Sequence, residues 1–284
     1  MSPEVTAIIT THKRPDHLRE ALVSLRQEEH RHFECIVVED GESIDPARIR
    51  DWHPDAWLLR GRSLGVAGAR NLGLDAASGT FSIFLDDDDV ALPLRISTLL
   101  RAAKASAADI CYGRTRRVSA DGARAGDVPT HQIRPGTAGF CDVLTCAPHI
   151  NAVLVRTELL REAGGFDCRS AHFDDWSAWL RLADRGARIW SVPDTLAEWR
   201  LHDAGLTGMV SRTRVLSRYL VELFDRLLRE LSEEGARAVA VARQVASTQG
   251  IETYDDYARG MDLIRTTLHA REQCLGPRLL SHCG

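Results

Sequence analysis

Short apolar segments alternate with segments of helical periodicity through the first 90 residues, and this alternation restricts the fold more than any other feature. Apolar, strand-like runs fall at residues 5–9, 35–41, 56–61 and 80–85. Apolar residues recur at helical spacing after the first run, and residues 65–79 have the composition of a small-residue helix that its final glycine would end. Strands that alternate with helices predict an α/β fold with a mostly parallel, doubly wound sheet.

Polar residues directly follow three of these predicted strands. They are the segments Thr10–Arg14, Glu39–Glu42 and Asp86–Asp89. Ligands of such sheets bind in the crevice beyond the carboxyl ends of the strands. We therefore expect the three segments to converge on one ligand site.

The four consecutive aspartates Asp86–Asp89 repel one another unless a cation joins them. Magnesium commonly takes one or two protein carboxylates and completes its shell with substrate phosphates and water. The alternative is a polar turn in which one aspartate caps a helix expected at 93–106. The position of the run after a strand, together with this habit of magnesium, favours a metal-bound phosphate ester. No P-loop motif is present and no GxGxxG follows the first strand, which argues against a P-loop and a dinucleotide site.

The pattern changes in the second half of the chain. We expect strands within 109–120 and at 150–156, and two strand-like pieces near 187–192 and 196–201. Residues 119–137 are rich in Gly, Pro, Asp and Thr, which predicts a loop or lid.

Two helical segments follow. Residues 172–186 carry one apolar face and end at Gly186, where a C-cap glycine is expected. From about residue 212, leucines and a phenylalanine recur at helical spacing, at Leu216, Leu220, Leu223, Phe224, Leu227 and Leu231. We expect this stripe to pack on its own domain, while a homodimer interface or a membrane-surface contact stays open.

Composition limits the class of protein. Lysine and arginine total 36 against 40 aspartates and glutamates, for a formal net charge of −4, so the basic excess of a nucleic-acid binder is missing. The seven cysteines include no CxxC pair, which favours free thiols in a reducing compartment. The first residues lack a signal-peptide pattern and no run of about 18 apolar residues occurs, so we expect a cytoplasmic protein. A peripheral membrane contact is compatible with this composition.

Seven motifs in this order resemble those of family 2 glycosyltransferases with a GT-A fold. They are VTAIITTHKRPDHLREAL, CIVVEDGES, GVAGARNLGLDAASG, FSIFLDDDD, LLREAGGFD, HFDDWSAWLRLADRG and WRLHDAGLT. The resemblance covers roughly residues 5–207. It implies a Rossmann-like GT-A domain at 1–210, with a nucleotide-sugar part (1–110) and an acceptor part (111–210), followed by a C-terminal helical extension at 211–284. It also implies a nucleoside diphosphate sugar donor, Mn²⁺ or Mg²⁺ as cofactor, and inversion at the anomeric carbon.

On the donor side, the resemblance places five residues beside the nucleotide. Thr10 and Thr11 end the first strand, with Arg14 nearby. Asp40 matches the acid that reads the base and ribose, in an EDG turn whose Glu39 replaces a commoner aspartate. The ARN motif places Arg70 near the nucleotide.

Within the aspartate run, the resemblance makes Asp88 the metal ligand and places Asp86 and Asp87 on the nucleotide side. Asp89 is expected to serve structure by leading into the next helix. His202 matches a position near the diphosphate where imidazole suits manganese better than magnesium. A loop histidine without a role is the alternative for His202.

The later ED motif of the family falls on Asp174 and Asp175, where Asp174 replaces the usual Glu. The resemblance makes Asp175 the general base that takes the proton of the acceptor hydroxyl. The alternative is that one of the pair only caps the helix expected to begin near Trp176.

Acceptor contacts are the least constrained. His149, Asn151 and Asp174 are weak candidates. The arginines near the 119–137 segment form a solvated face or an acceptor lid. They are Arg114, Arg116, Arg117, Arg124 and Arg134.

The sequence therefore predicts an inverting, metal-dependent glycosyltransferase that moves a sugar, expected to be UDP-linked, to a hydroxyl acceptor. The acceptor would be a glycan, a lipid-linked molecule or a small molecule. A sugar-1-phosphate nucleotidyltransferase and a non-catalytic nucleotide-sugar-binding protein are the alternatives. The nucleotidyltransferase would need a glycine-rich loop after the first strand, and TTHKRPDH contains no glycine.

Overall fold

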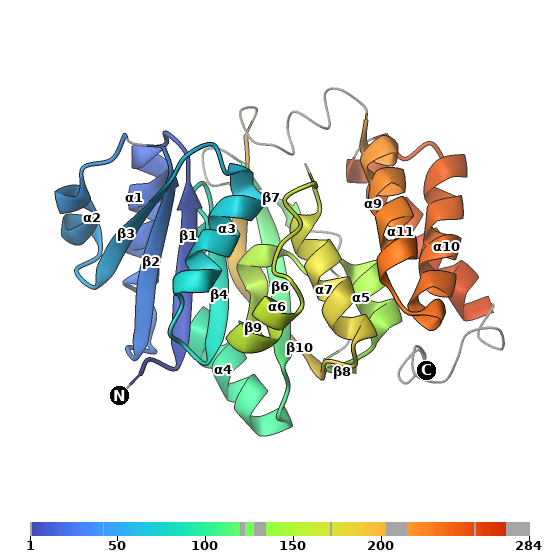
Figure 1. The fold of residues 1–284 in the computed structure, drawn as a ribbon, viewed down its shortest axis with the longest axis horizontal. Coiled ribbons are helices and arrows are strands. Elements are labelled where there is room, and N and C mark those ends of the chain that lie inside the picture. The colour runs from blue at the N-terminus through green and yellow to red at the C-terminus, as the bar shows by residue number, and fades with distance from the viewer. Residues whose placement is uncertain are drawn as a thin grey trace.

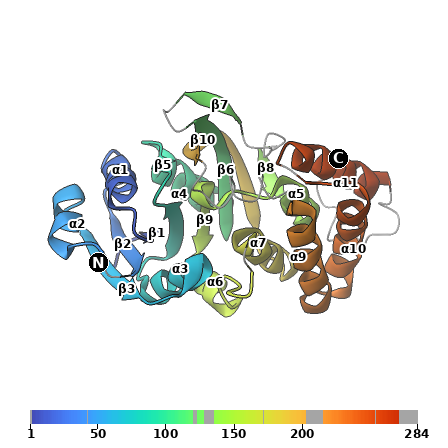
Figure 2. The same cartoon turned by 90° about the horizontal axis from the view of Figure 1, so that it is seen from above.

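The computed structural model of the chain is built around one mixed sheet (Figures 1 and 2). The residues that it describes are 2–41, 43–119, 123–127, 135–170, 172–202, 215–252 and 254–270. The strand order is β3-β2-β1-β4-β9-β6-β10-β5, with β7 paired to β6 and β8 to β10. The expected α/β fold with a mostly parallel sheet flanked by helices is confirmed.

The first half of the chain forms the parallel part of the sheet. Its strands are β1 (Val5–Thr11), β2 (Phe33–Asp40), β3 (Ala56–Gly61) and β4 (Phe81–Asp86), and its helices are α1 (Pro15–Leu25), α2 (Pro46–Trp52) and α3 (Gly65–Ala76). Strand β1 pairs in parallel with both β2 and β4, so the segments that follow these strands emerge at the same edge.

The second half of the chain adds two long strands, β6 and β10, several short strands, and further helices. It comprises β5 (Val90–Ala91), α4 (Arg95–Ser106), β6 (Ile110–Ser119), β7 (Arg124–Asp127), β8 (Gly136–Ala138), α5 (Phe140–Cys146), a 3₁₀ turn η2 (Ile150–Ala152), β9 (Val153–Arg156), α6 (Thr157–Glu162), α7 (Asp174–Asp184) and β10 (Ile189–Leu201). Strand β9 runs antiparallel between β4 and β6, and β10 returns in parallel beside β6.

The two faces of the sheet bury separate cores, because successive strand residues point to opposite sides. In β1, Ile9 packs in the core that holds Leu18 and Leu22 of α1. Its neighbour Ile8 packs in the other core, together with Ala67 of α3 and the helices of the C-terminal half.

Three helices complete the chain: α9 (Leu216–Glu230), α10 (Glu233–Thr248) and α11 (Tyr254–Ala270). The leucine stripe of α9 is buried from Leu216 through Leu227 in the same core as Trp176 and Trp179 of α7. The prediction that the stripe packs on its own domain is confirmed. Its burial within the chain removes the stripe as a surface for a homodimer or a membrane.

Several local predictions were wrong in detail. The pieces near 187–192 and 196–201 form one irregular strand, β10, and the expected 119–137 loop contains the strands β7 and β8. Helix α3 ends at Ala76, before Gly79. A Cβ at Gly79 would lie 2.6 Å from the backbone N of Thr6, so this glycine permits close strand packing.

Gly186 has the predicted role. It follows α7 with φ +84°, and the Gly186 N–H donates to the carbonyl of Ala183 at 3.0 Å. Among the described residues, none of the helices combines the length and the apolar character that a bilayer crossing requires.

Candidate active site

The three polar segments meet at the carboxyl edge of β1, β2 and β4, as predicted. Thr10 lies opposite Asp86 in the β1–β4 register, and Thr11 lies opposite Glu39 in the β1–β2 register. The Thr11 hydroxyl donates to Asp87 Oδ2 at 2.6 Å. The carboxyl ends of three strands therefore bring these residues together at one edge of the sheet.

Asp40 ties the second strand to the start of helix α3. Its two carboxylate oxygens accept hydrogen bonds from the backbone N–H groups of Leu64 and Gly65, each at 2.9 Å. The preceding residue, Glu39, is fully buried and accepts from the Ser43 and Ile44 N–H groups. Glu39 therefore shapes the turn, and Asp40 is the acid of the pair at the exposed edge.

Asp88 lies between two basic side chains. It forms an ion pair with Arg14, and His202 Nε2 lies 2.9 Å from Asp88 Oδ2. Burial opposes ionisation of this carboxyl, but the charge of Arg14 and the bond with His202 outweigh it and lower the pKa of Asp88. The His17 ring of α1 stacks on His202 with centroids 5.6 Å apart. This arrangement keeps Asp88 ionised and holds an imidazole against it.

The flanking aspartates of the run are buried and differ from Asp88. Burial raises the pKa of Asp87 to about 7, although Arg14 lies 3.4 Å away. Burial and the charges of Asp88 and Asp86 raise the pKa of Asp89 well above its ordinary value. Only Asp88 and Asp86 retain substantial exposed side-chain area, at 16% and 27%.

Arg70 joins the aspartate turn to helix α7. Its guanidinium donates to Asp86 Oδ1 and to Asp174 Oδ2, each at 2.7 Å. Arg70 is buried, yet the two carboxylates raise its pKa against the desolvation that would lower it. The guanidinium also lies over the Phe166 ring, 5.7 Å from its centroid. The bridge fixes the start of α7 relative to the end of β4.

Neither Asp174 nor Asp175 occupies the N-cap position of helix α7, although the Asp175 side chain bonds to an N–H group of its first turn. The N-cap position is Phe173, in the left-handed region at φ 62°, and it makes no side-chain capping bond. Asp175 Oδ1 accepts from the Trp176 N–H at 2.7 Å. Burial first, and then the charge of Asp174, raise the pKa of Asp175 to about 7. A carboxyl group with this pKa can exchange protons near neutral pH.

Of the three weak acceptor candidates, Asp174 is buried and bound by Arg70, and the other two occupy different positions. The His149 ring lies against Trp199 of β10, with centroids 5.1 Å apart, and burial lowers the pKa of His149 to about 4. Asn151 is fully buried and bonds to the aspartate turn. Asn151 therefore lies beneath the site rather than at a surface that an acceptor could reach.

Only part of the basic region around the predicted lid lies within the described residues. Arg116 pairs with Glu198 of the neighbouring strand. Arg134 and the side chain of Arg124 lie outside the described residues. So do residues 203–214, which contain the end of the WRLHDAGLT motif.

The sequence interpretation missed two site residues. His17 stacks on His202, and the Arg200 backbone N–H donates to Asp89 Oδ1 at 2.7 Å. Position 17 falls in the first turn of α1, three residues after Arg14, which is a spacing that places both side chains near one face. The Arg200 contact is a backbone bond and could not be read from side-chain types.

Asp88 and His202 fit a divalent cation whose remaining coordination positions a substrate would fill. Within the described part of the chain, no three His, Cys, Asp or Glu side chains are grouped as metal ligands. Asp88 and His202 together offer one carboxylate and one imidazole, and such a two-residue set leaves positions for diphosphate oxygens and water.

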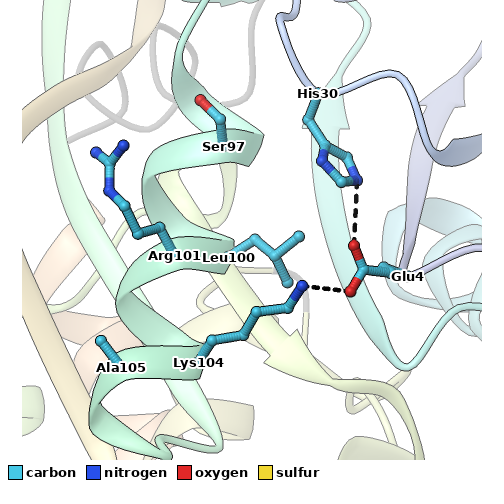
Figure 3. Close-up of a pocket in the computed structure, with 7 residues that line it drawn as sticks. All are labelled: Glu4, His30, Ser97, Leu100, Arg101, Lys104 and Ala105. Atoms are coloured by element: carbon cyan, nitrogen blue, oxygen red, sulfur yellow. Dashed lines mark hydrogen bonds and ion pairs between the residues drawn. The ribbon is translucent and has the colours of Figure 1, made fainter.

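A surface pocket lies at the opposite end of the sheet (Figure 3). Its lining includes Glu4, which precedes β1, and Lys104 and Arg101 of α4. Glu4 pairs with Lys104, and His30 Nε2 lies 4.0 Å from Glu4. The pocket is therefore separated by the length of β1 from the aspartates.

Comparison with known proteins decides the family. The family model described as glycosyl transferase family 2 matches residues 6–151, just over half of the chain. The chain belongs to glycosyl transferase family 2. It is a glycosyltransferase, and this result excludes the nucleotidyltransferase and the non-catalytic alternatives.

Relatives of this family 2 glycosyltransferase cover most of its length. The uncharacterized glycosyltransferase YwdF of Bacillus subtilis is 28% identical over 206 residues, which are 71% of this chain and 76% of that protein. Among solved structures, S. aureus TarS 1-349 in complex with UDP-GlcNAc is similar with a TM-score of 0.64 at 14% identity, over 93% of this chain and 92% of that one. The Pyrobaculum calidifontis mannosyltransferase PcManGT, in complex with GDP-Man and Mn²⁺, gives 0.63 at 20% identity, over 95% and 76%. These two likenesses confirm the GT-A fold.

Proposed function

We propose that this family 2 glycosyltransferase moves a sugar from a uridine diphosphate sugar to a hydroxyl acceptor, with inversion and with a divalent metal. The observation that carries the proposal is the Arg70 bridge. It links Asp86, in the turn that would bind the donor, to Asp174, the neighbour of the proposed base Asp175. A single buried guanidinium thus holds the donor side and the acceptor side in one geometry.

On the donor side, Thr10, Thr11 and Asp40 edge the crevice expected to take the nucleoside. Asp88 and His202 would hold Mn²⁺ or Mg²⁺, and Arg14 would supply positive charge to the diphosphate. When bound, the metal would act as a Lewis acid that stabilises the departing diphosphate. The ion pair of Asp88 with Arg14 and its hydrogen bond with His202 support this role, because they keep the carboxylate charged and ready for a cation.

On the acceptor side, Asp175 would take the proton of the attacking hydroxyl. The hydroxyl oxygen bonds to the anomeric carbon while the bond from that carbon to the diphosphate oxygen breaks on the opposite face. The proton moves to Asp175, and the bonding electrons leave with the nucleoside diphosphate. The raised pKa of Asp175 supports this assignment, since a base works best when its pKa lies near the operating pH.

The donor is argued from the fold neighbours, which bind UDP-GlcNAc in one case and GDP-Man with Mn²⁺ in the other. The test is a thermal-shift screen of UDP, GDP and their sugars, each in Mn²⁺ and in EDTA. A ligand that binds the native state raises the unfolding temperature. At a concentration of 100 times its Kd, it adds about 2.7 kcal/mol to the free energy of unfolding. We expect UDP with Mn²⁺ to give the largest shift. A larger shift with GDP would reassign the nucleotide, and equal shifts in Mn²⁺ and EDTA would contradict metal use.

A further inference from the structure

The two residues proposed to hold the metal come from distant parts of the chain. Asp88 lies in the turn after β4, and His202 follows the end of β10. Between these elements, the backbone pairing of β5 with β10 covers only Val90 and Ala91. Holding His202 Nε2 at 2.9 Å from Asp88 Oδ2 therefore needs a further connection between the turn and β10.

A buried hydrogen-bond chain supplies that connection. The Asn151 side-chain carbonyl accepts from the Asp86 N–H at 3.0 Å, and its amide donates to Asp89 Oδ2. The other Asp89 oxygen accepts from the Arg200 N–H at 2.7 Å, two residues before His202. Asn151 is 0% and Asp89 2% exposed, so neither can contact a substrate.

We propose that Asn151 and Asp89 are positioning residues that hold Asp88 at the correct distance from His202. This inference rests on the proposed role of Asp88 and His202 in metal binding. Both ends of the aspartate turn are held: Asn151 fixes the start at the Asp86 amide, and Asp89 fixes the end against β10. Outer residues of this kind orient metal ligands, and losing one typically costs about 10–100-fold in metal affinity.

The directions of these bonds allow an exchange of the two residues. Asn151 accepts one bond and donates one, whereas Asp89 accepts two. In the double variant Asn151→Asp with Asp89→Asn, the new aspartate accepts from the Asp86 N–H and from the new amide. The new amide oxygen accepts from the Arg200 N–H. Every bond and the net charge are therefore kept.

Each single variant breaks the chain. Asn151→Asp places two carboxylates in contact, and Asp89→Asn places two amide donors in contact. A buried group left without its partner costs about 1–3 kcal/mol, so both singles are expected to fold with lowered stability. Asn151→Ala removes the two bonds without adding charge and replaces Asn151→Asp if that variant does not fold.

The experiment titrates UDP by calorimetry, in Mn²⁺ and in EDTA, against wild type, both singles and the exchange variant. The singles should lose about tenfold or more in UDP affinity in Mn²⁺, with affinity in EDTA within about twofold of wild type. The exchange should restore affinity in Mn²⁺ to within about twofold of wild type. The control is Thr157→Val, which removes the buried bonds of Thr157 with Ser82 and Gly79 at the other end of β4. It should lower stability without changing the effect of Mn²⁺.

Two results would overturn the positioning role: an exchange variant no better than the weaker single, or singles that lose affinity equally in Mn²⁺ and EDTA. Failure of the proposed function would look different. Wild type itself would then bind UDP equally in Mn²⁺ and in EDTA, and the inference would fall with the metal site.

Discussion

Two acidic clusters face each other across Arg70, and they are tuned in opposite directions. In the turn after β4, Asp88 contacts Arg14 and His202, and its pKa is lowered. At the start of α7, the pKa of Asp175 is raised to about 7, and no cationic side chain among the described residues forms an ion pair with it. The same side chain is therefore prepared for a cation in one place and for a proton in the other.

The side chains around each aspartate, rather than the aspartate itself, therefore determine whether its pKa is lowered or raised. Desolvation disfavours the charged form in both clusters, and at Asp88 the charge of Arg14 and the hydrogen bonds from Arg14 and His202 reverse that effect. The charge of Arg70 also lowers the pKa of Asp175, but the two bonds of Arg70 go to Asp86 and Asp174, and burial outweighs its effect on Asp175. The partner Asp174 takes the cation, and its negative charge then helps to keep a proton on Asp175.

The largest expected effect comes from Asp175→Asn. Replacing the base with an amide of the same shape removes its proton affinity, so the rate of transfer should fall about 10³-fold. UDP affinity in Mn²⁺ should stay within about twofold of wild type, because Asp175 lies on the acceptor side. Calorimetry and single-turnover transfer with the donor selected by the binding screen measure the two quantities. A variant that keeps its turnover would remove Asp175 as the base.

The matched change in the other cluster, Asp88→Asn, should have a smaller effect and of a different kind. It removes the carboxylate charge, so UDP affinity should fall about 100-fold in Mn²⁺ and change little in EDTA. Calorimetric titration in the two buffers measures this contrast. If Asp88→Asn retained the Mn²⁺ dependence of wild type, the distinction between the two clusters would be lost.

Much of the first half of the site could be predicted from the sequence. The β1, β2 and β4 segments are short apolar runs, and parallel strands bring their polar ends to one edge. The four aspartates after β4 could also be ranked, with Asp88 as the metal-facing residue and Asp89 as the structural one. The burial of Asp89 is consistent with a structural role, whereas the metal role of Asp88 stays a prediction.

The rest depends on tertiary contacts that leave no local pattern. Asn151 was predicted to face an acceptor because of its place in the chain, yet its amide turns inward to the aspartate turn. Capping was a reasonable alternative for Asp174, because aspartate is strongly favoured at N-caps. Phe173 takes that position in a left-handed conformation instead, which its residue type does not indicate.

The most direct test of the central claim is the pH dependence of single-turnover transfer at saturating donor. The folded-state pKa of Asp175 is raised, so its protonated form predominates below about pH 7 and the active base forms as the pH rises. The rate should therefore increase about tenfold per pH unit below 7 and level off above it. The residual rate of Asp175→Asn should lack this rise. A wild-type rate that stays constant from about pH 5.5 to 8, the range that spans this pKa, would contradict the assignment of Asp175 as the proton acceptor.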